Sequence, residues 1–320
     1  MKKVIIIGAS GQDGSFLTKL LLEKNYEIIC TSRNKTVDEY YNHDIIKIKK
    51  IKIIYEKLNT LDLEQIKQIL NKYNPDEIYN LGAQSSVGLS YTFPLETMNS
   101  IINSTLNILE AIRFHNTKIK FYNAGSGEAF GNYEEKIINE ESCFRPLSPY
   151  AVAKASSSML VKSYRESYNI NCCTGHLFNH ESYLRSENFV TKKIILSAIK
   201  IFKGELDFLK LGNIDISRDW GWAPEYVEVM WMMLQQKTTK DYIISTGVTS
   251  SLTEFISIAF DYFNLNYQDY LVIDESLFRP SDIAINKSDP SLAKKDMGWH
   301  HKTGLKKIVT QLIEHELNKK

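Results

Sequence analysis

The stretch "VIIIGASGQDGSFLTKLLL" near the amino terminus constrains the fold more than any other part of the chain. A short apolar run, residues 4–7, leads into Gly8, Gly11 and Gly14, and an apolar face with helical spacing follows directly. A buried strand that passes through a tight glycine turn into a helix is the opening of a strand-helix-strand unit. Such units build parallel sheets, because their crossover helices cover the sheet faces.

The first half of the chain repeats this alternation of apolar runs and amphipathic stretches. Short β-branched or aromatic runs predict strands at residues 3–7, 27–31, 52–55, 77–80, 119–123 and 172–176. Helical periodicity predicts sheet-covering helices within residues 14–26 and 94–116. We therefore expect an α/β fold with a Rossmann-type doubly wound parallel sheet. Residues 1–178 would form this domain, with later segments returning to it, and residues 179–320 would mainly form a smaller carboxy-terminal domain.

The overall charge gives no reason to expect nucleic acid or an anionic membrane as a partner. The 320 residues include 39 Lys and Arg against 38 Asp and Glu, a formal net charge of +1. The sequence has neither the run of about 20 apolar residues that a membrane helix needs nor a secretory signal. Four cysteines without CxxC spacing predict reduced thiols in the cytoplasm. The histidines show no metal-ligand spacing, so we expect no metal.

The glycine spacing also predicts what the turn binds. Glycine lets the backbone approach a pyrophosphate closely, and the unpaired N–H groups at a helix amino terminus attract its negative charge. Gly8, Gly11 and Gly14 therefore indicate a dinucleotide site, although a tight turn without a ligand would use the same residues.

The end of the second predicted strand bears on which nicotinamide cofactor fits. It reads "CTSRNK", with Arg33 and no acid. An acid there would bind a ribose 2′-hydroxyl, whereas a basic residue accommodates a 2′-phosphate. NADP is therefore favoured over NAD, unless Arg33 is only a solvated surface cation, which would leave NAD open.

The segment "SPYAVAK" places Tyr150 and Lys154 four residues apart, on the same face of a predicted helix. A free tyrosine has a pKa near 10, so its ionisation at pH 7 costs about 4 kcal/mol, and a neighbouring ammonium offsets part of that cost. The pair can thus act as a general base that takes a hydroxyl proton while hydride leaves for a nicotinamide. The spacing alone also occurs by chance. The glycine turn and Ser126, at the end of another strand-like run, favour the catalytic interpretation.

Together these motifs resemble the extended short-chain dehydrogenases/reductases, and among them the GDP-mannose 4,6-dehydratases. The resemblance covers nearly the whole chain, in the segments "GASGQDGS", "PDEIYNLGAQSSVGLS", "FYNAGSGEAFG", "SPYAVAK", "LFNHES", "FVTKKI", "GNIDISRDWGWAPEYVE", "YIISTGVT" and "FRPSD". It implies a GDP-sugar substrate, a nicotinamide cofactor and nucleotide-sugar binding mainly by residues 179–320.

The resemblance implies a 4,6-dehydration in which Ser126, Glu128, Tyr150 and Lys154 are catalytic. Tyr150 would take the carbon-4 hydroxyl proton as hydride passes to NADP. Glu128 would then remove the acidified carbon-5 proton and protonate the departing carbon-6 hydroxyl, and hydride would return to carbon 6. Glu128 is the discriminating residue, because a 4-reductase or epimerase of the same fold needs no carboxylate there. From the residues alone it could equally be a surface or capping carboxylate in a turn-rich loop.

The resemblance also implies individual residues that contact the cofactor and the substrate. Beside the three glycines, the implied cofactor contacts are Ser10, Gln12, Asp13, Arg33, Leu58, Leu81, Ala83, Tyr150, Lys154, His180 and Arg185. The implied substrate contacts are Ser85, Asn179, Lys193, Arg218 and Arg279. The two arginines suit bidentate phosphate binding. Considered singly, Arg218 next to Asp219 would more often form a structural ion pair, and His180 would more often be a capped loop histidine.

Three departures from the family pattern limit these implications. Lys57 stands where the family has an aspartate facing adenine, and residues 34–50 replace a second arginine and a serine-rich arm that joins dimers. Tyr183 and Leu184 stand where the family has Pro and Arg, so the sugar could differ, for example a GDP-manno-heptose.

The resemblance also implies an oligomeric state, and the residues leave alternative activities open. We expect a homodimer through the helix holding Tyr150 and the helix over residues 98–114, and we leave a homotetramer open. A GDP-sugar 4-reductase or epimerase, and a non-catalytic nucleotide-binding homologue, are the alternatives to a dehydratase.

Overall fold

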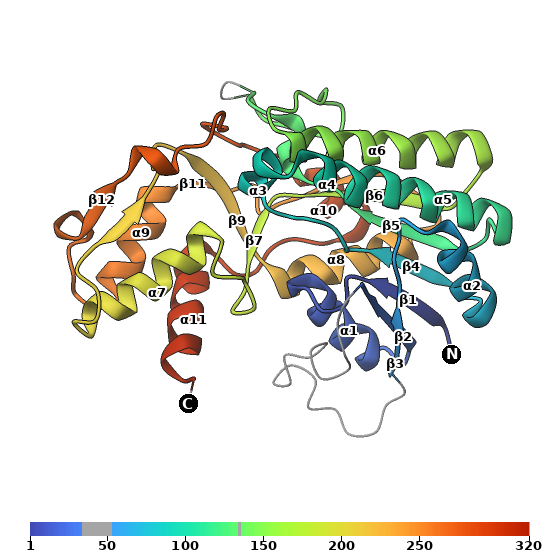
Figure 1. The fold of residues 1–320 in the computed structure, drawn as a ribbon, viewed down its shortest axis with the longest axis horizontal. Helices are drawn as coiled ribbons and strands as arrows, with labels where there is room; N and C mark the ends of the chain where they lie inside the picture. The colour runs from blue at the N-terminus through green and yellow to red at the C-terminus, as the bar shows by residue number, and fades with distance from the viewer. Residues whose placement is uncertain (34–52, 134–135, 320) are drawn as a thin grey trace.

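The main element of the structure, a computed structural model that describes residues 1–33, 53–133 and 136–319, is a parallel seven-stranded sheet (Figure 1). Its strand order is β10-β6-β5-β4-β1-β2-β3. The strands are β1 (Lys3–Ile7), β2 (Glu27–Ser32), β3 (Ile53–Lys57), β4 (Glu77–Asn80), β5 (Lys120–Ala124), β6 (Cys172–Leu177) and β10 (Tyr242–Ile244). The predicted strands are confirmed to within two residues, except that Lys52 lies outside the described residues. The order reverses between β1 and β4, which is where doubly wound sheets bind ligands.

Two apolar cores cover the two faces of this sheet. On one face α1 (Gln12–Glu23) and α8 (Ala223–Gln235) pack together, with Leu17 and Met230 fully buried. On the other face lie α2 (Leu63–Tyr73), α5 (Ser104–His115) and α6 (Pro149–Tyr168), with Ile108 and Val161 fully buried. Figure 1 shows the sheet between these two helix layers. The Rossmann-type doubly wound prediction is confirmed.

The predicted helix over residues 94–116 contains an irregular turn. It begins as α4 (Pro94–Met98), widens into a π-helical turn (Asn99–Asn103) and continues as α5. A shorter helix, α3 (Val87–Thr92), precedes it. The other predicted helix is α1, which ends before Asn25, a residue in the left-handed conformation. π-Helical turns often occur at functional sites because they redirect side chains.

The smaller unit lies at one end of the sheet. It contains a three-stranded sheet of β7 (Asn179–Glu181), β9 (Ser217–Trp222) and β11 (Thr249–Ser251), and the pair β8 (Leu209–Leu211) and β12 (Leu271–Ile273). Three helices, α7 (Val190–Phe202), α9 (Leu252–Asp261) and α11 (Leu305–Leu317), enclose a third core around Phe255. Between these segments the chain returns to the large sheet through α8, β10 and α10 (Ser291–Met297).

A helix that spans a bilayer needs about 20 predominantly apolar residues. None of the helices in the described parts of the chain combines the length and the apolar character needed to span a membrane.

Candidate active site

The glycine turn connects β1 to α1, and its backbone is packed too closely for side chains at Gly8 and Gly14. Gly8 has φ +82°, which an L side chain rarely adopts, and a Cβ on Gly14 would lie 2.3 Å from the carbonyl oxygen of Gly8. Gly11 is the N-cap residue of α1, so the free N–H groups of the first helical turn face the end of the sheet. The local geometry therefore fits the anion site that the glycine spacing predicted.

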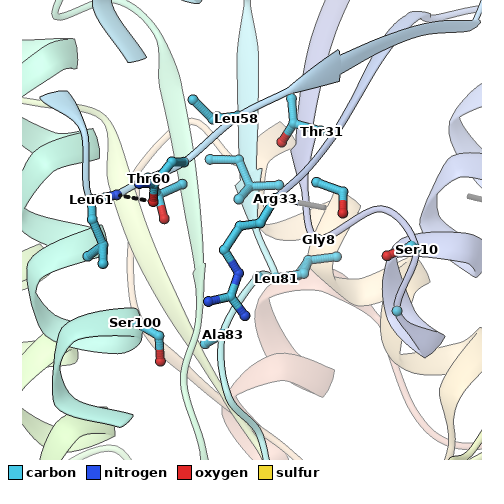
Figure 2. Close-up of a pocket in the computed structure, with 15 residues that line it drawn as sticks. Gly8, Ser10, Thr31, Arg33, Leu58, Thr60, Leu61, Leu81, Ala83 and Ser100 are labelled. Carbon is cyan, nitrogen blue, oxygen red and sulfur yellow. Dashed lines mark hydrogen bonds between the residues drawn. The ribbon is translucent and has the colours of Figure 1, made fainter. Parts of the chain in front are cut away.

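A cavity of about 300 Å³ opens beside this turn (Figure 2). Among the predicted cofactor contacts, seven line it: Gly8, Ser10, Gly11, Arg33, Leu58, Leu81 and Ala83. Figure 2 shows the Arg33 side chain reaching across the cavity with its guanidinium toward Ala83. The lining combines the backbone of the glycine turn and the Arg33 cation with the apolar side chains of Leu58 and Leu81.

The cavity also contains residues that the sequence analysis missed. Ser32 and Thr31 end β2, residues 59–61 follow β3, and Ser100 comes from the π-helical turn. Ser100 donates to the carbonyl oxygen of Thr97 (3.1 Å) and accepts from the backbone N–H of Gln84 (3.4 Å). No periodic signal marks Ser100, because the π turn departs from the helical repeat.

Gln12, Asp13 and Gly14 are absent from the cavity lining. The Asp13 carboxylate lies 3.0 Å from Nε2 of His180 on β7. The amide of Gln12 donates to Asp13 Oδ1 (3.1 Å), and its oxygen accepts from the hydroxyl of Ser182 (2.8 Å). These contacts join the glycine turn to the smaller unit, which is how Gln12 and Asp13 act in this structure.

His180 is held at both ring nitrogens. Nδ1 lies 2.8 Å from the carbonyl oxygen of Phe178, and the ring stacks on Tyr226 at 4.6 Å. Burial would lower the pKa of His180, but the charge of Asp13 and the hydrogen bond to it raise that pKa overall. Burial likewise opposes ionisation of Asp13, yet His180 keeps the pKa of Asp13 below its ordinary value. The pair is thus an ion pair that links β7 to the glycine turn.

Tyr150 and Lys154 lie in the first turns of α6, as their spacing predicted. Ser148 is the N-cap residue, and its hydroxyl accepts from the N–H of Ala151 at 3.1 Å. Both functional side chains belong to residues that are only 8 % exposed. Nζ of Lys154 lies 5.7 Å from the centre of the Tyr150 ring and donates to the carbonyl oxygen of Ala124 (2.7 Å).

Burial decides the protonation of this pair. It raises the pKa of Tyr150 to about 12, against the opposing hydrogen bond with Ser126 and the charge of Arg185, and Glu128 raises it further. It lowers the pKa of Lys154 to about 8. This burial, which the sequence analysis did not weigh, outweighs the influences that favour the phenolate of Tyr150. Tyr150 is a neutral phenol here at pH 7.

Glu128 follows Ser126 by two residues, and its charge acts on Tyr150. It lies in a short 3-10 turn (Gly127–Phe130) directly after β5, where the hydroxyl of Ser126 accepts from the N–H of Glu128 at 3.2 Å. The side chain is 16 % exposed, and Oε1 lies 3.9 Å from Nε of Arg218. Burial raises the pKa of Glu128, and Arg218 and Arg279 offset only part of that rise. Raising the pKa of a carboxyl group makes its carboxylate a stronger base, which can accept a proton and later return it.

Arg218 is held by Asp282, a residue that the sequence analysis missed. Nη2 of Arg218 lies 2.9 Å from Asp282 Oδ1, and Nη1 donates to the carbonyl oxygen of Ile283 at 2.6 Å. The alternative pairing of Arg218 with Asp219 is not formed, because the Asp219 carboxylate accepts from the N–H groups of Thr246 and Gly247. The exposed Arg279 lies 3.7 Å from Asp282.

The remaining predicted contacts surround this cluster. Asn179 begins β7 next to Trp220, and Ser85 is exposed on the loop after β4. The pKa of Asp274 is lowered chiefly by its hydrogen bonds with Ser276, and the charge of Lys193 adds a smaller effect. The substrate contacts of Asn179, Ser85 and Lys193 stay predictions.

Arg185 and Lys57 complete the set. The Arg185 guanidinium lies over the Phe189 ring at 3.7 Å, and Lys57 is exposed at the end of β3. Residues 34–50, the altered arm segment, lie outside the described residues. Within the described part of the chain, no group of three or more His, Cys, Asp or Glu could hold a metal ion.

Comparison with known proteins places this geometry in a family. The family model described as GDP-mannose 4,6 dehydratase matches residues 5–312. GDP-mannose 4,6 dehydratase 1 of Arabidopsis thaliana is 40 % identical over 326 residues, which cover 99 % of this chain and 90 % of that protein.

Two solved structures share the fold at low sequence identity. dTDP-glucose 4,6-dehydratase of Bacillus anthracis in complex with NAD superposes with a TM-score of 0.85 at 17 % identity, covering 99 % of this chain and 97 % of that one. RMD of Pseudomonas aeruginosa in complex with NADPH has a TM-score of 0.79 at 19 % identity and covers 98 % of each chain. The chain therefore belongs to the GDP-mannose 4,6-dehydratase family and has its short-chain dehydrogenase/reductase fold.

Proposed function

We propose that this protein is a GDP-mannose 4,6-dehydratase, which converts the bound sugar to its 4-keto-6-deoxy form. The observation that carries the proposal is a buried carboxyl group, Glu128, placed two residues after Ser126 at the end of β5 and near enough for its charge to act on Tyr150. The hydroxyl and phenol alone would serve a reductase or an epimerase. A buried carboxyl group of raised pKa adds the proton transfers that an elimination of water requires.

The glycine turn and the adjoining cavity suit a nicotinamide dinucleotide, and we propose NADP. Gly8 and Gly14 permit the tight turn that brings the N-terminus of α1 beside the cavity, where a pyrophosphate would bind. Arg33 reaches across the cavity, where it would pair with a ribose 2′-phosphate. The bound cofactor would supply the chemistry of accepting a hydride from the sugar and returning it.

The chain's own residues would manage the protons. Ser126, which opposes the rise in the pKa of Tyr150 that burial causes, would hydrogen-bond the phenol and orient it toward the sugar hydroxyl. The cation of Arg185 favours negative charge on the phenol oxygen, which Tyr150 needs before it can accept the hydroxyl proton, because burial holds its resting pKa at about 12. Glu128 would take the carbon-5 proton and deliver it to the departing hydroxyl. Arg218 and Arg279 would hold the diphosphate, exchanging part of their contact with Asp282.

Incubation with GDP-mannose tests this function. We expect mass spectrometry to detect a product that has lost one water, with no net change in nicotinamide absorbance. Stoichiometric consumption of reduced cofactor would instead identify a 4-reductase, and a product of unchanged mass an epimerase. A parallel reaction with a GDP-manno-heptose tests whether Tyr183 and Leu184 have changed the sugar that is accepted.

A variant separates catalysis from simple nucleotide binding. Tyr150→Phe removes only the hydroxyl, so we expect it to lose turnover and to keep its affinity for the nucleotide. If the variant retained its full physiological activity, that result would support a non-catalytic role for the protein.

We also propose a homodimer in the cytoplasm. Large apolar side chains are exposed along α4, α5 and α6: Leu95 (79 %), Phe114 (66 %), Met159 (63 %) and Tyr168 (45 %). A second copy could cover this face as a four-helix contact. All four cysteines are free, which suits a reducing compartment. Analytical ultracentrifugation measures the assembly and distinguishes a dimer from a tetramer.

A further inference from the structure

Residues 181–189, here called the strap, join β7 to the start of α7 and carry Arg185. In Figure 1 this yellow-green loop runs between β7 and α7, and α11 lies beside α7. The strap contains Tyr183 and Leu184, where the family resemblance implied Pro and Arg. The structure shows what the new aromatic side chain contacts.

Tyr183 connects the two halves of the molecule. Its ring stacks on His315 of α11, with centres 4.2 Å apart and planes at 20°. It meets Phe16 of α1 edge to face at 5.6 Å and lies 6.3 Å from Trp222 at the end of β9. Tyr183 therefore packs against both the core of the large sheet and the core of the smaller unit.

A buried ion pair holds the strap from the same helix. Lys192 and Glu316 form this pair with side chains only 5 % and 8 % exposed. Nζ of Lys192 also donates to the carbonyl oxygen of Tyr183 at 3.2 Å. Because His315 and Glu316 are neighbours in the last turns of α11, one helix end holds both the ring and the backbone of Tyr183.

The residue before Tyr183 attaches the strap to the first residue of α1, directly after the glycine turn. The hydroxyl of Ser182 donates to Gln12 (2.8 Å) and accepts from the N–H of Leu184 (3.1 Å), while the N–H of Arg185 donates to the carbonyl oxygen of Ser182 (3.0 Å). The strap is thus fixed on both sides of Tyr183, and the next turn of the chain presents Arg185.

Arg185 occupies a position from which its charge acts on the proposed active site. Its Nε lies 3.3 Å from Glu181 Oε2, and its guanidinium covers the Phe189 ring. The same charge acts on Tyr150, Asp13 and His180. A small displacement of the strap would move this cation relative to both the cofactor site and the phenol.

We propose that Tyr183 is a positioning residue: stacked on His315, it transmits the anchorage of the α11 terminus to Arg185 and so sets the affinity for the nicotinamide dinucleotide. The inference rests on the proposed function only for the identity of the ligand. It makes the carboxy-terminal helix part of the cofactor site, although α11 does not line the cavity.

A double-mutant cycle on cofactor binding tests the proposal. The dissociation constant for NADPH is measured by fluorescence for the wild type, Tyr183→Ala, Arg185→Ala and the double variant. An aromatic contact of this kind predicts binding about threefold to tenfold weaker in Tyr183→Ala. If Tyr183 acts through Arg185, Tyr183→Ala should have little further effect once Arg185 is absent. Two independent, multiplicative effects would overturn the proposal.

Hydrogen exchange supplies a readout that does not depend on the cofactor. In Tyr183→Ala and in His315→Ala, amide protection should fall within residues 181–189, whereas Phe202→Ala, which breaks a similar stack with Phe263 (4.7 Å), should leave it unchanged. Unchanged protection of the strap in both variants, or equal loss in Phe202→Ala, would refute the proposal. If the wild type binds NADPH but does not turn over GDP-mannose, the proposed function fails and the cycle still decides the role of Tyr183.

Discussion

Replacing Lys154 with methionine should stabilise the protein while destroying its activity. Burial lowers the pKa of Lys154 from an ordinary 10.5 to about 8, so folding with the ammonium charged costs about 3 kcal/mol at pH 7. Methionine keeps the apolar stem and removes the charge. It also removes the hydrogen bond to the carbonyl oxygen of Ala124, which offsets about 1 kcal/mol of the gain. The variant should therefore be about 2 kcal/mol more stable at pH 7.

The pH dependence of this gain is the sharper test. The pKa of Lys154 is lower in the folded state than in the unfolded state. The free-energy cost of burying its ammonium is therefore fully present below about pH 8, and it disappears as the pH rises past the unfolded pKa of 10.5. The stability difference between variant and wild type should therefore shrink by about 2 kcal/mol between pH 7 and pH 9.5. Urea unfolding at both values measures it.

Lys162, an exposed lysine on the same helix, supplies the control. Lys162→Met should change stability little at either pH, because its ammonium stays in water. A Lys154→Met variant that is less stable than the wild type at pH 7, or a difference that does not respond to pH, would refute the reasoning. Loss of turnover in the stabilised variant would show that the charged lysine is kept for function rather than for folding.

Three other substitutions test the remaining parts of the site. Glu128→Gln should slow dehydration by about 10²- to 10⁴-fold while still oxidising carbon 4, so reduced nicotinamide should accumulate in an absorbance assay; dehydration within tenfold of wild type would contradict its role. Gly14→Ala should weaken NADPH binding and lower stability by about 1–3 kcal/mol, since the new Cβ would lie 2.6 Å from Cα of Ala9. Gly304→Ala, which meets nothing within 4 Å, is its control in thermal unfolding. Arg33→Ala should weaken binding of NADPH more than that of NADH in fluorescence titrations, and equal losses would argue against a phosphate contact.

Local patterns in the sequence predicted the parts of the fold that depend on local chemistry. The β-branched runs predicted the strands, because a strand buried on both faces must be apolar throughout. The three glycines predicted the turn, because Gly8 and Gly14 are each surrounded by backbone atoms. The spacing of Tyr150 and Lys154 predicted their common face, because helical periodicity alone determines it.

Contacts between segments far apart in the sequence could not be predicted from local patterns. Asp282 holds Arg218 across 64 positions of the chain, and Asp13 meets His180 across 167. Neither pair has a periodic signature. The rise in the pKa of Tyr150 could not be predicted for a related reason: the neighbouring lysine is visible in the sequence, but the extent of burial is a property of the whole fold.

The return of the chain to the large sheet affects how the protein can form during synthesis. β10 pairs with β6, and α8 covers the face of α1, yet both lie beyond residue 220. While a ribosome is still translating the intervening segment, the nascent sheet has an open margin at β6 and an uncovered apolar layer over α1. The nucleotide-binding half can therefore mature only after residue 244 has left the exit tunnel, and a protein that ended at residue 178 should be prone to aggregate.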